Sequence, residues 1–234
     1  MLKEDVSPAP AGPAEMAAAV PHVVLFDFDG VLIRGDAFYL FMRERYARSL
    51  WRPLLALLSA PLLLLQLPFS RALPARTLVR IALLGLGEQR YQAVARGFAA
   101  TLVRRPRQFC RDGLQALRRH QVAGDRVIVV TGCEHTLVNG ILQQLGLTNL
   151  EVLASQLRPG WLGVRPLRHN VGRRKVELLA QHGLTAWQVA YSDSLRDVPM
   201  LKPAAEVVLV NGTPTLCKKV EKALGRVITR VEWF

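Results

Sequence analysis

The sequence predicts an α/β fold, with a doubly wound parallel sheet, helices on both of its faces and a helical subdomain inserted after the first strand. Three observations indicate this class. Short apolar segments alternate with helical stretches, polar side chains directly follow several of these segments, and the stretch after the first segment has apolar residues at three- and four-residue spacing. The expected strands are Val23–Asp27, Arg126–Val130, Glu151–Ala154, Gln188–Ser192 and Val207–Val210.

The length and composition allow one α/β core and one inserted subdomain, since the chain has 234 residues of which 50% are hydrophobic. We expect a core made of residues 21–36 and 106–234, and a helical cap made of residues 37–105. Residues 1–20 are rich in proline and alanine and lack the continuous apolar region of a secretory signal, so we expect a flexible tail. Three widely spaced cysteines indicate free thiols in a reducing compartment and give no zinc pattern.

The first expected strand ends in Asp27-Phe28-Asp29-Gly30. Residues two apart in a strand face the same side, so the carboxylates of Asp27 and Asp29 converge. Two acids at the end of a buried strand lose hydration and repel each other, which indicates that they serve a cation or a reaction. A plain Asp-Gly turn would use Asp29 and Gly30 but would not need Asp27.

Polar residues also mark the later strands and one helix. Thr131 and Gly132 follow the second strand. Lys175 lies in the first turns of a helix that we expect to begin near Gly172, where the helix dipole disfavours a cation and an anionic ligand would explain one. Asp193 and Asp197 follow the fourth strand. Side chains at the carboxyl ends of parallel strands point into the crevice where ligands bind.

Two further elements are indicated near the C-terminal half. A hairpin is expected at Leu157–Val164, between Thr131 and Lys175 in the chain. Thr213 and Pro214 are suited to begin a helix, with Thr213 as N-cap and Pro214 at the first helical position.

Four motifs resemble, in this order, those of the haloacid dehalogenase superfamily of phosphohydrolases, in the branch that includes phosphoserine phosphatase. They are Asp27-Phe28-Asp29-Gly30, Thr131, Lys175, and Ser192-Asp193 with Asp197. The resemblance implies a Rossmann-like core and a phosphatase that acts through an aspartyl-phosphate. It implies that Asp27 attacks phosphorus, and that Asp29 protonates the leaving oxygen and then deprotonates the hydrolytic water. Thr131 would donate to a phosphoryl oxygen, and Lys175 would balance the negative charge.

The resemblance also implies a Mg²⁺ cofactor with few protein ligands. These would be the carboxylate of Asp27, the main-chain carbonyl of Asp29 and the carboxylate of Asp193. Asp197 would be either a further ligand or a residue that orients the ligands. Backbone amides near Gly30 and Gly132 would add donors to the phosphoryl group.

Several other residues are left out of the expected site. Asp36 lies where phosphoserine phosphatases carry an acidic cap residue near the substrate, but it equally suits the N-cap of a helix that begins at the next residue. His22, His135 and His169 lack metal-ligand spacing and are expected in loops or at the surface. Cys133 lies close to the second motif, but a thiol has no role in this chemistry.

Four further segments sharpen the resemblance: Phe38–Arg43, the apolar run of residues 53–69, Ala154–Leu157 and Tyr191–Ser194. With them, the chain after residue 20 is similar to the bacterial phosphatidylglycerophosphatase C type of enzyme. This implies dephosphorylation of phosphatidylglycerophosphate to phosphatidylglycerol at a membrane. Val31, where many relatives carry threonine, leaves all the charged positions intact.

Residues 53–70 contain no charged side chain and approach the length of a membrane span. Pro61 would kink a helix at the middle of this run, and arginines flank it on both sides, which favours the cytoplasmic side for both ends. We therefore expect a re-entrant or interfacial helix pair, with a buried hairpin of the cap as the alternative. The flanking arginines are Arg43, Arg45, Arg48, Arg52, Arg71, Arg76 and Arg80.

The net charge of +13 agrees with an anionic membrane surface as partner. No nucleic-acid-binding motif is visible, so no nucleic-acid partner is expected. The expected location is the cytoplasmic face of the bacterial inner membrane. One alternative is a cytoplasmic phosphatase of a small phosphoserine-like ester. The other is a membrane-bound scaffold without activity, against which the complete set of motif residues argues.

Overall fold

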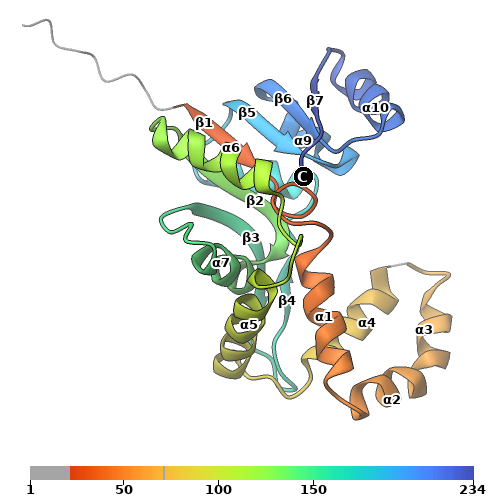
Figure 1. Ribbon diagram of the computed structural model, residues 1–234. Coiled ribbons are helices and arrows are strands. Elements are labelled where there is room, and N and C mark those ends of the chain that lie inside the picture. The colour runs from red at the N-terminus through yellow and green to blue at the C-terminus, as the bar shows by residue number, and fades with distance from the viewer. Residues whose placement is uncertain (1–21, 71) are drawn as a thin grey trace, which may run out of the picture.

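Strand β1 (Val23–Phe26) lies in the interior of a seven-stranded sheet in the computed structural model, which describes residues 22–70 and 72–234 (Figure 1). The strand order is β4-β3-β2-β1-β5-β6-β7, and every neighbouring pair is parallel except β3 with β4. The predicted α/β class with a doubly wound sheet is confirmed. The other strands are β2 (Arg126–Glu134), β3 (Glu151–Arg158), β4 (Arg165–Arg168), β5 (Trp187–Ser192), β6 (Ala204–Val210) and β7 (Thr229–Val231).

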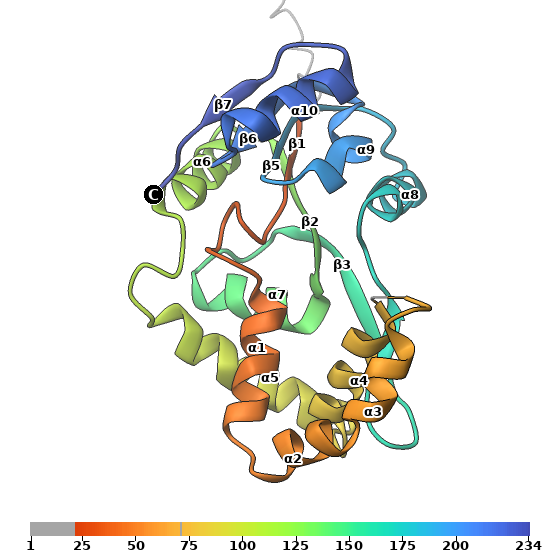
Figure 2. The same cartoon turned by 90° about the vertical axis from the view of Figure 1, so that its right-hand side faces the viewer.

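Six helices follow β1 in the described residues before the chain returns to the sheet at β2, and Figures 1 and 2 show the first four grouped at one end of the molecule. The first five are α1 (Ala37–Ala47), α2 (Trp51–Leu58), α3 (Ala60–Gln66), α4 (Ala72–Leu83) and α5 (Glu88–Val103). The remaining helices are α6 (Arg111–Val122), α7 (His135–Gln144), α8 (Arg173–Gln181), the 3-10 turn η1 (Leu195–Asp197), α9 (Val198–Leu201) and α10 (Pro214–Leu224). The division into core and cap stays a prediction, and its tail of residues 1–20 lies outside the described residues.

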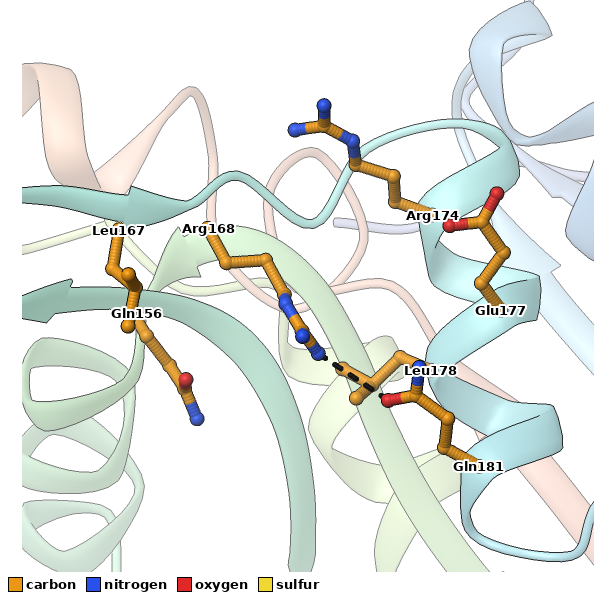
Figure 3. Close-up of a pocket in the computed structure, with 7 residues that line it drawn as sticks. All are labelled: Gln156, Leu167, Arg168, Arg174, Glu177, Leu178 and Gln181. Carbon is orange, nitrogen blue, oxygen red and sulfur yellow. Dashed lines mark hydrogen bonds between the residues drawn. The ribbon is translucent and has the colours of Figure 1, made fainter.

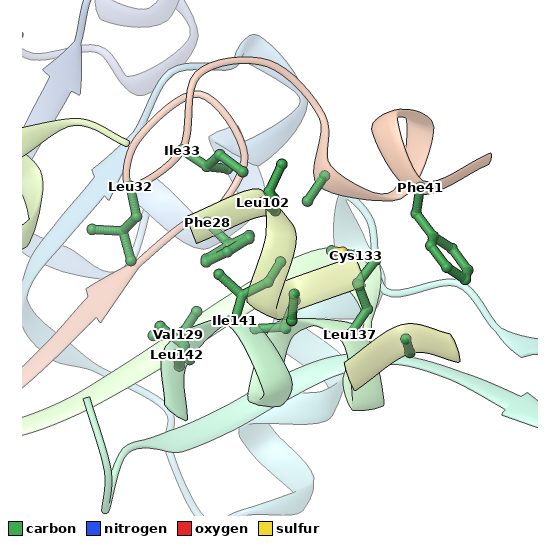
Figure 4. Close-up of a cluster of buried hydrophobic side chains, with 14 of the residues drawn as sticks. Phe28, Leu32, Ile33, Phe41, Leu102, Val129, Cys133, Leu137, Ile141 and Leu142 are labelled. Atoms are coloured by element: carbon green, nitrogen blue, oxygen red, sulfur yellow. The ribbon is translucent and has the colours of Figure 1, made fainter. Parts of the chain in front are cut away.

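Helices cover both faces of the sheet, and alternate residues of β1 face the two sides. Phe26 packs in the cluster that includes Leu137 and Ile141 of α7, while Leu25 packs in a second cluster with Leu179 of α8. Both clusters are fully buried at these positions, which explains why the strand is apolar throughout. Figure 4 shows how Phe28, Leu32 and Ile33 continue the first cluster beyond the end of β1.

The expected strand bounds were clearly too short at three places, and one strand was missed. β2 continues past Val130 to Glu134, with a register shift against β3, and β3 continues to Arg158. β6 begins at Ala204 rather than at Val207. The expected hairpin is present, but its antiparallel arm β4 makes the sheet mixed rather than fully parallel. β7 has three residues at the sheet edge, too few for an alternating pattern to be recognised.

The apolar run forms two short helices, α2 and α3, rather than one long one. The break lies at Ser59, and Pro61 falls in the first turn of α3, where its missing N–H costs no helical hydrogen bond. No residue of either helix is buried, and Leu57, Leu65 and Phe69 are 70%, 66% and 78% exposed. Within the described ranges, no helix has both the length and the apolar character needed to cross a membrane.

The predicted start of α10 provides a local test of the fold. Thr213 Oγ1 accepts a hydrogen bond from Leu216 N at 3.2 Å, and Pro214 occupies the first turn. Thr213→Ala removes the acceptor, so the free energy of unfolding, measured by urea denaturation, should fall by about 1 kcal/mol. Thr213→Ser keeps the hydroxyl and should retain most of the stability. An equal loss in both variants would contradict the cap.

Candidate active site

Asp27 and Asp29 lie directly beyond β1 and are held by main-chain contacts. The Asp27 N–H donates to Tyr191 O at 3.0 Å, which ties this residue to β5. Asp27 Oδ1 accepts from Phe28 N at 2.7 Å, and Asp29 Oδ1 accepts from Ala37 N at 2.8 Å, at the start of α1. Phe28, which lies between them in the chain, packs in the core (Figure 4), while Asp27 and Asp29 line the cavity described below.

Lys175 brings the end of β1 together with the turn after β5. Its Nζ lies 3.0 Å from Asp27 Oδ2 and 2.9 Å from Asp197 Oδ2, and its side chain is almost fully buried. Ser192 Oγ donates to the same Asp197 oxygen at 2.8 Å. Asp197 thus contacts Lys175 and Ser192, an arrangement that suits an orienting residue.

Gly30 allows the Asp193 carboxylate to approach the loop after β1. Gly30 has φ +78°, and a Cβ built on it would lie 1.8 Å from Asp193 Oδ2. Any other residue would therefore collide with Asp193 as well as strain the backbone. The glycine of the first motif is explained by this close approach.

Thr131 does not lie at the cavity wall, where its motif predicts it. It is buried, its Oγ1 accepts from Cys133 N at 3.0 Å, and it is not among the residues that line the cavity described below. Gly132 does line the cavity, and its carbonyl accepts from Ser155 Oγ at 2.7 Å. The structure therefore brings Gly132 to the cavity wall and leaves Thr131 just behind it.

Asn170 is a buried residue of this site that the sequence reasoning missed. Its Nδ2 donates to Thr131 O at 3.2 Å and to Leu153 O at 2.9 Å, and its N–H donates to Ser155 Oγ at 2.9 Å. It thereby fixes the ends of β2 and β3 against the segment that leads to Lys175. No local signal marks it, because its partners depend on how the β3–β4 hairpin folds back.

Burial and the neighbouring charges shift the pKa values of the ionisable groups in the site. Burial raises the pKa of Asp27 well above its usual value, since Lys175 offsets only part of the lost hydration, and burial also raises the pKa of Asp193. Burial raises the pKa of Asp29 to about 7. Burial alone would raise the pKa of Asp197, but the Lys175 ammonium and hydrogen bonds outweigh it and the pKa falls. Burial also opposes the charge of Lys175, yet the two carboxylates raise its pKa.

A cavity of about 490 Å³ joins most of the expected residues. Asp27, Asp29, Gly30, Gly132, Lys175, Asp193 and Asp197 all line it. Asp36 lines it too while it caps α1, where Asp36 Oδ1 accepts from Tyr39 N at 2.7 Å. His169 and Cys133 also reach the wall, although burial raises the pKa of the Cys133 thiol well above its usual value, which disfavours the reactive thiolate.

The donor set fits a Mg²⁺ ion. Asp27 and Asp193 both offer carboxylate oxygens. Because Gly30 has no Cβ, the Asp193 carboxylate can approach the loop that follows Asp27. Among the described residues, no three His, Cys, Asp or Glu side chains are grouped as a metal site. A Mg²⁺ ion here would therefore rely also on main-chain oxygen, for which the resemblance implies the Asp29 carbonyl, and on water.

The comparison with protein families identifies one match over most of the chain. The model of the family described as haloacid dehalogenase-like hydrolase matches residues 24–202. A histidinol-phosphatase of Neisseria meningitidis serogroup C (strain 8013) is 27% identical over 118 residues, which cover 45% of this chain and 52% of the relative. The chain thus spans about half the length of this curated relative.

Solved structures share the fold at low sequence identity. A protein of unknown function from Bordetella pertussis Tohama I matches with a TM-score of 0.67 and 21% identity, over 90% of this chain and 99% of that one. A substrate-bound phosphoserine phosphatase matches with a TM-score of 0.56 and 18% identity, over 86% and 90% of the two chains.

The Asn170 network supplies a stability prediction. Asn170→Ala leaves the carbonyls of Thr131 and Leu153 buried without a donor, so the free energy of unfolding should fall by about 2 kcal/mol in urea denaturation. Asn139→Ala is the matched control, because the Asn139 side chain hydrogen-bonds near the surface to His135 and, among the described residues, to no buried carbonyl. A loss at Asn170 no larger than that at Asn139 would contradict the network.

Proposed function

This chain belongs to the haloacid dehalogenase-like hydrolase family, and we propose that it is a Mg²⁺-dependent phosphatase that hydrolyses phosphate monoesters through an aspartyl-phosphate on Asp27. The observation that carries the proposal is the junction of Asp27, Lys175 and Asp197 beside Asp29 and Asp193 in one cavity. A site that pairs acids with a buried ammonium suits a phosphoryl group, whose charge must be balanced during transfer.

In the first step, an oxygen of the Asp27 carboxylate attacks phosphorus, and the bond from phosphorus to the leaving oxygen breaks. Lys175 keeps one Asp27 oxygen in place, and the Phe28 N–H holds the other. The leaving oxygen takes a proton from Asp29. A pKa of about 7 lets Asp29 exist in both protonation states near neutrality, as this role requires.

In the second step, water attacks the phosphorus of the aspartyl-phosphate and gives a proton to Asp29. The bond between phosphorus and the Asp27 oxygen breaks, which restores the carboxylate and releases phosphate. Gly30 and Gly132 border the space that the phosphoryl group would occupy. A Mg²⁺ ion held by Asp27, the Asp29 carbonyl and Asp193 would neutralise charge on that group.

A small soluble phosphomonoester is the substrate class best supported. The cavity has the volume typical of small-molecule sites, and the curated relative is named a histidinol-phosphatase. A phosphoserine-like ester, expected as an alternative from the sequence, belongs to this class. The protein would then act in the cytoplasm.

A phospholipid substrate, phosphatidylglycerophosphate, is a second candidate that one observation favours. Helices α2 and α3 expose an apolar surface beside arginines of α1 and α4, as an interfacial helix pair would. In this case the protein would act peripherally at the cytoplasmic face of the bacterial inner membrane. The apolar residues of the two helices, and of the turn that follows α3, are Trp51, Leu54, Leu57, Leu58, Leu62, Leu64, Leu65, Leu67 and Phe69.

Replacement of the nucleophile separates an enzyme from an inactive scaffold. Asp27→Asn keeps the size of the side chain but removes the attacking carboxylate, so Mg²⁺-dependent phosphate release should fall by at least about 10³-fold. The circular dichroism spectrum should be retained. Glu177→Gln, an exposed change on α8, is the control. Turnover that persists in Asp27→Asn at the wild-type rate would remove Asp27 as nucleophile.

A substrate comparison separates the two candidates. Phosphate release with Mg²⁺ is measured for histidinol phosphate, phosphoserine, an aryl phosphate and phosphatidylglycerophosphate in mixed micelles. We expect kcat/KM to be highest for a soluble ester and unchanged in Leu57→Glu/Leu65→Glu. A kcat/KM that is highest for the lipid would contradict a soluble substrate, provided that this preference is lost in the double variant and kept in the control Val122→Glu on α6.

A further inference from the structure

His169 lies beside Gly132, which borders the space that the phosphoryl group would occupy. A Cβ built on Gly132 would lie 3.9 Å from His169 Cε1 and 3.0 Å from Val171 Cγ2. The absence of that Cβ therefore lets the segment after β4 pack closely against β2. Both Gly132 and His169 line the catalytic cavity, and His169 is exposed, so a ligand in the cavity can reach its ring.

The residues on either side of His169 anchor it to the rest of the fold. Arg168 lines a separate cavity of about 360 Å³ between β4 and α8, where its Nη1 donates to Gln181 Oε1 at 3.3 Å (Figure 3). Asn170 is buried, and its side chain donates to carbonyls of β2 and β3. His169 is therefore held between two anchored neighbours, so a ligand does not have to order this segment when it binds.

The hydrogen bonds of Ser155 determine which nitrogen of His169 carries the proton. Ser155 Oγ has one proton, and it donates this proton to Gly132 O at 2.7 Å, because a carbonyl can only accept. Ser155 Oγ also accepts from Asn170 N at 2.9 Å. It lies 3.4 Å from His169 Nδ1 and has no second proton to give, so Nδ1 must be the donor. In the neutral imidazole, Nε2 is then the acceptor.

The surroundings of His169 favour this neutral form. Partial burial lowers the pKa of His169, and nearby arginines lower it further, against the opposing effect of Asp36. The arginines are Arg174, Arg76 and Arg196. The imidazole is therefore neutral near pH 7, and its Nε2 has a lone pair for a hydrogen bond.

The Nε2 atom of His169 has no hydrogen-bond partner in the part of the chain that the structure describes. His120 is the contrasting case, since its Nδ1 lies 2.7 Å from Asp125 Oδ2 and its Nε2 lies 3.1 Å from Tyr191 OH. The ring of His169 is bonded through one nitrogen only and stands at the wall of the catalytic cavity. It is therefore equipped to accept a hydrogen bond from a bound ligand.

We propose that His169 determines specificity for the leaving group, through a hydrogen bond that its Nε2 accepts from a hydroxyl or ammonium group of the substrate. Because His169 lies next to Gly132, this donor belongs to the part of the leaving group nearest the cleaved phosphate. A leaving group without a donor would displace water from Nε2 and give no hydrogen bond in return. The proposal rests on the proposed phosphatase function and narrows its substrate class.

Two pairs of matched esters test the role of His169. With Mg²⁺ present, kcat/KM is measured for glycerol 3-phosphate against propyl phosphate, and for ethanolamine phosphate against ethyl phosphate. Only the first ester of each pair carries a donor on its leaving group. We expect the wild type to prefer the donor-bearing ester by about 5-fold or more in at least one pair, which identifies the donor as hydroxyl or ammonium. The absence of a preference in both pairs would overturn the proposal.

Variants assign the preference to the imidazole. His169→Phe removes the acceptor and should abolish the preference, whereas His169→Gln, whose Oε1 can accept in place of Nε2, should retain part of it. His135→Phe is the matched control, because His135 lies on α7 and does not line the cavity. A general disturbance near Gly132 would slow both esters of a pair alike and leave their ratio unchanged. A preference that survives in His169→Phe would overturn the proposal.

Binding without turnover separates a failure of this proposal from a failure of the proposed function. Asp27→Asn protein with Mg²⁺ is titrated calorimetrically with the four esters, with and without His169→Phe. In at least one pair, His169→Phe should weaken the Kd of the donor-bearing ester by about 5-fold and leave the Kd of its partner unchanged. Equal effects within both pairs, or no binding, would overturn the role of His169. Wild-type protein that hydrolyses no ester would overturn the phosphatase, and the titration would still decide on His169.

Discussion

The ammonium of Lys175 lies buried between two carboxylates that arrive from different strands. Asp27 extends from β1 and Asp197 from the turn after β5, at 3.0 and 2.9 Å from Nζ. Because removal of Lys175 would leave both buried carboxylates without their cation, the two carboxylates depend on it. The ion cluster therefore ties α8 to the carboxyl ends of β1 and β5.

The topology explains why these groups meet. From β1 the chain continues to β2 and β3 on one side, and it later returns to β5 and β6 on the other. A crevice opens at such a reversal, at the carboxyl ends of the strands. Asp29 also accepts a hydrogen bond from the start of α1, the helix that leads to α2 and α3. The chain therefore passes from the cavity wall directly into the helices that expose the apolar surface.

Residues with a local signature could be predicted, and residues that depend on tertiary contacts could not. Asp27, Asp29 and Asp193 follow apolar strands, and Lys175 begins an amphipathic helix, so the sequence located them. Asn170 and Ser155 act through the β3–β4 hairpin and carry no pattern of their own. The apolar run predicted a helix pair broken near Pro61, and the break lies at Ser59, because Pro61 is accommodated in the first turn of α3.

The central claim, that Asp27 carries the phosphoryl group, is tested most directly by trapping the covalent intermediate. Asp29→Asn protein with Mg²⁺ is mixed with an aryl phosphate, whose leaving group needs no proton, and is quenched and reduced with borohydride before peptide mass spectrometry. Since Asp29 activates the water in the second step, the intermediate should accumulate and residue 27 should be recovered as homoserine. Phosphate release without modification of Asp27, or with modification at another residue, would contradict the account.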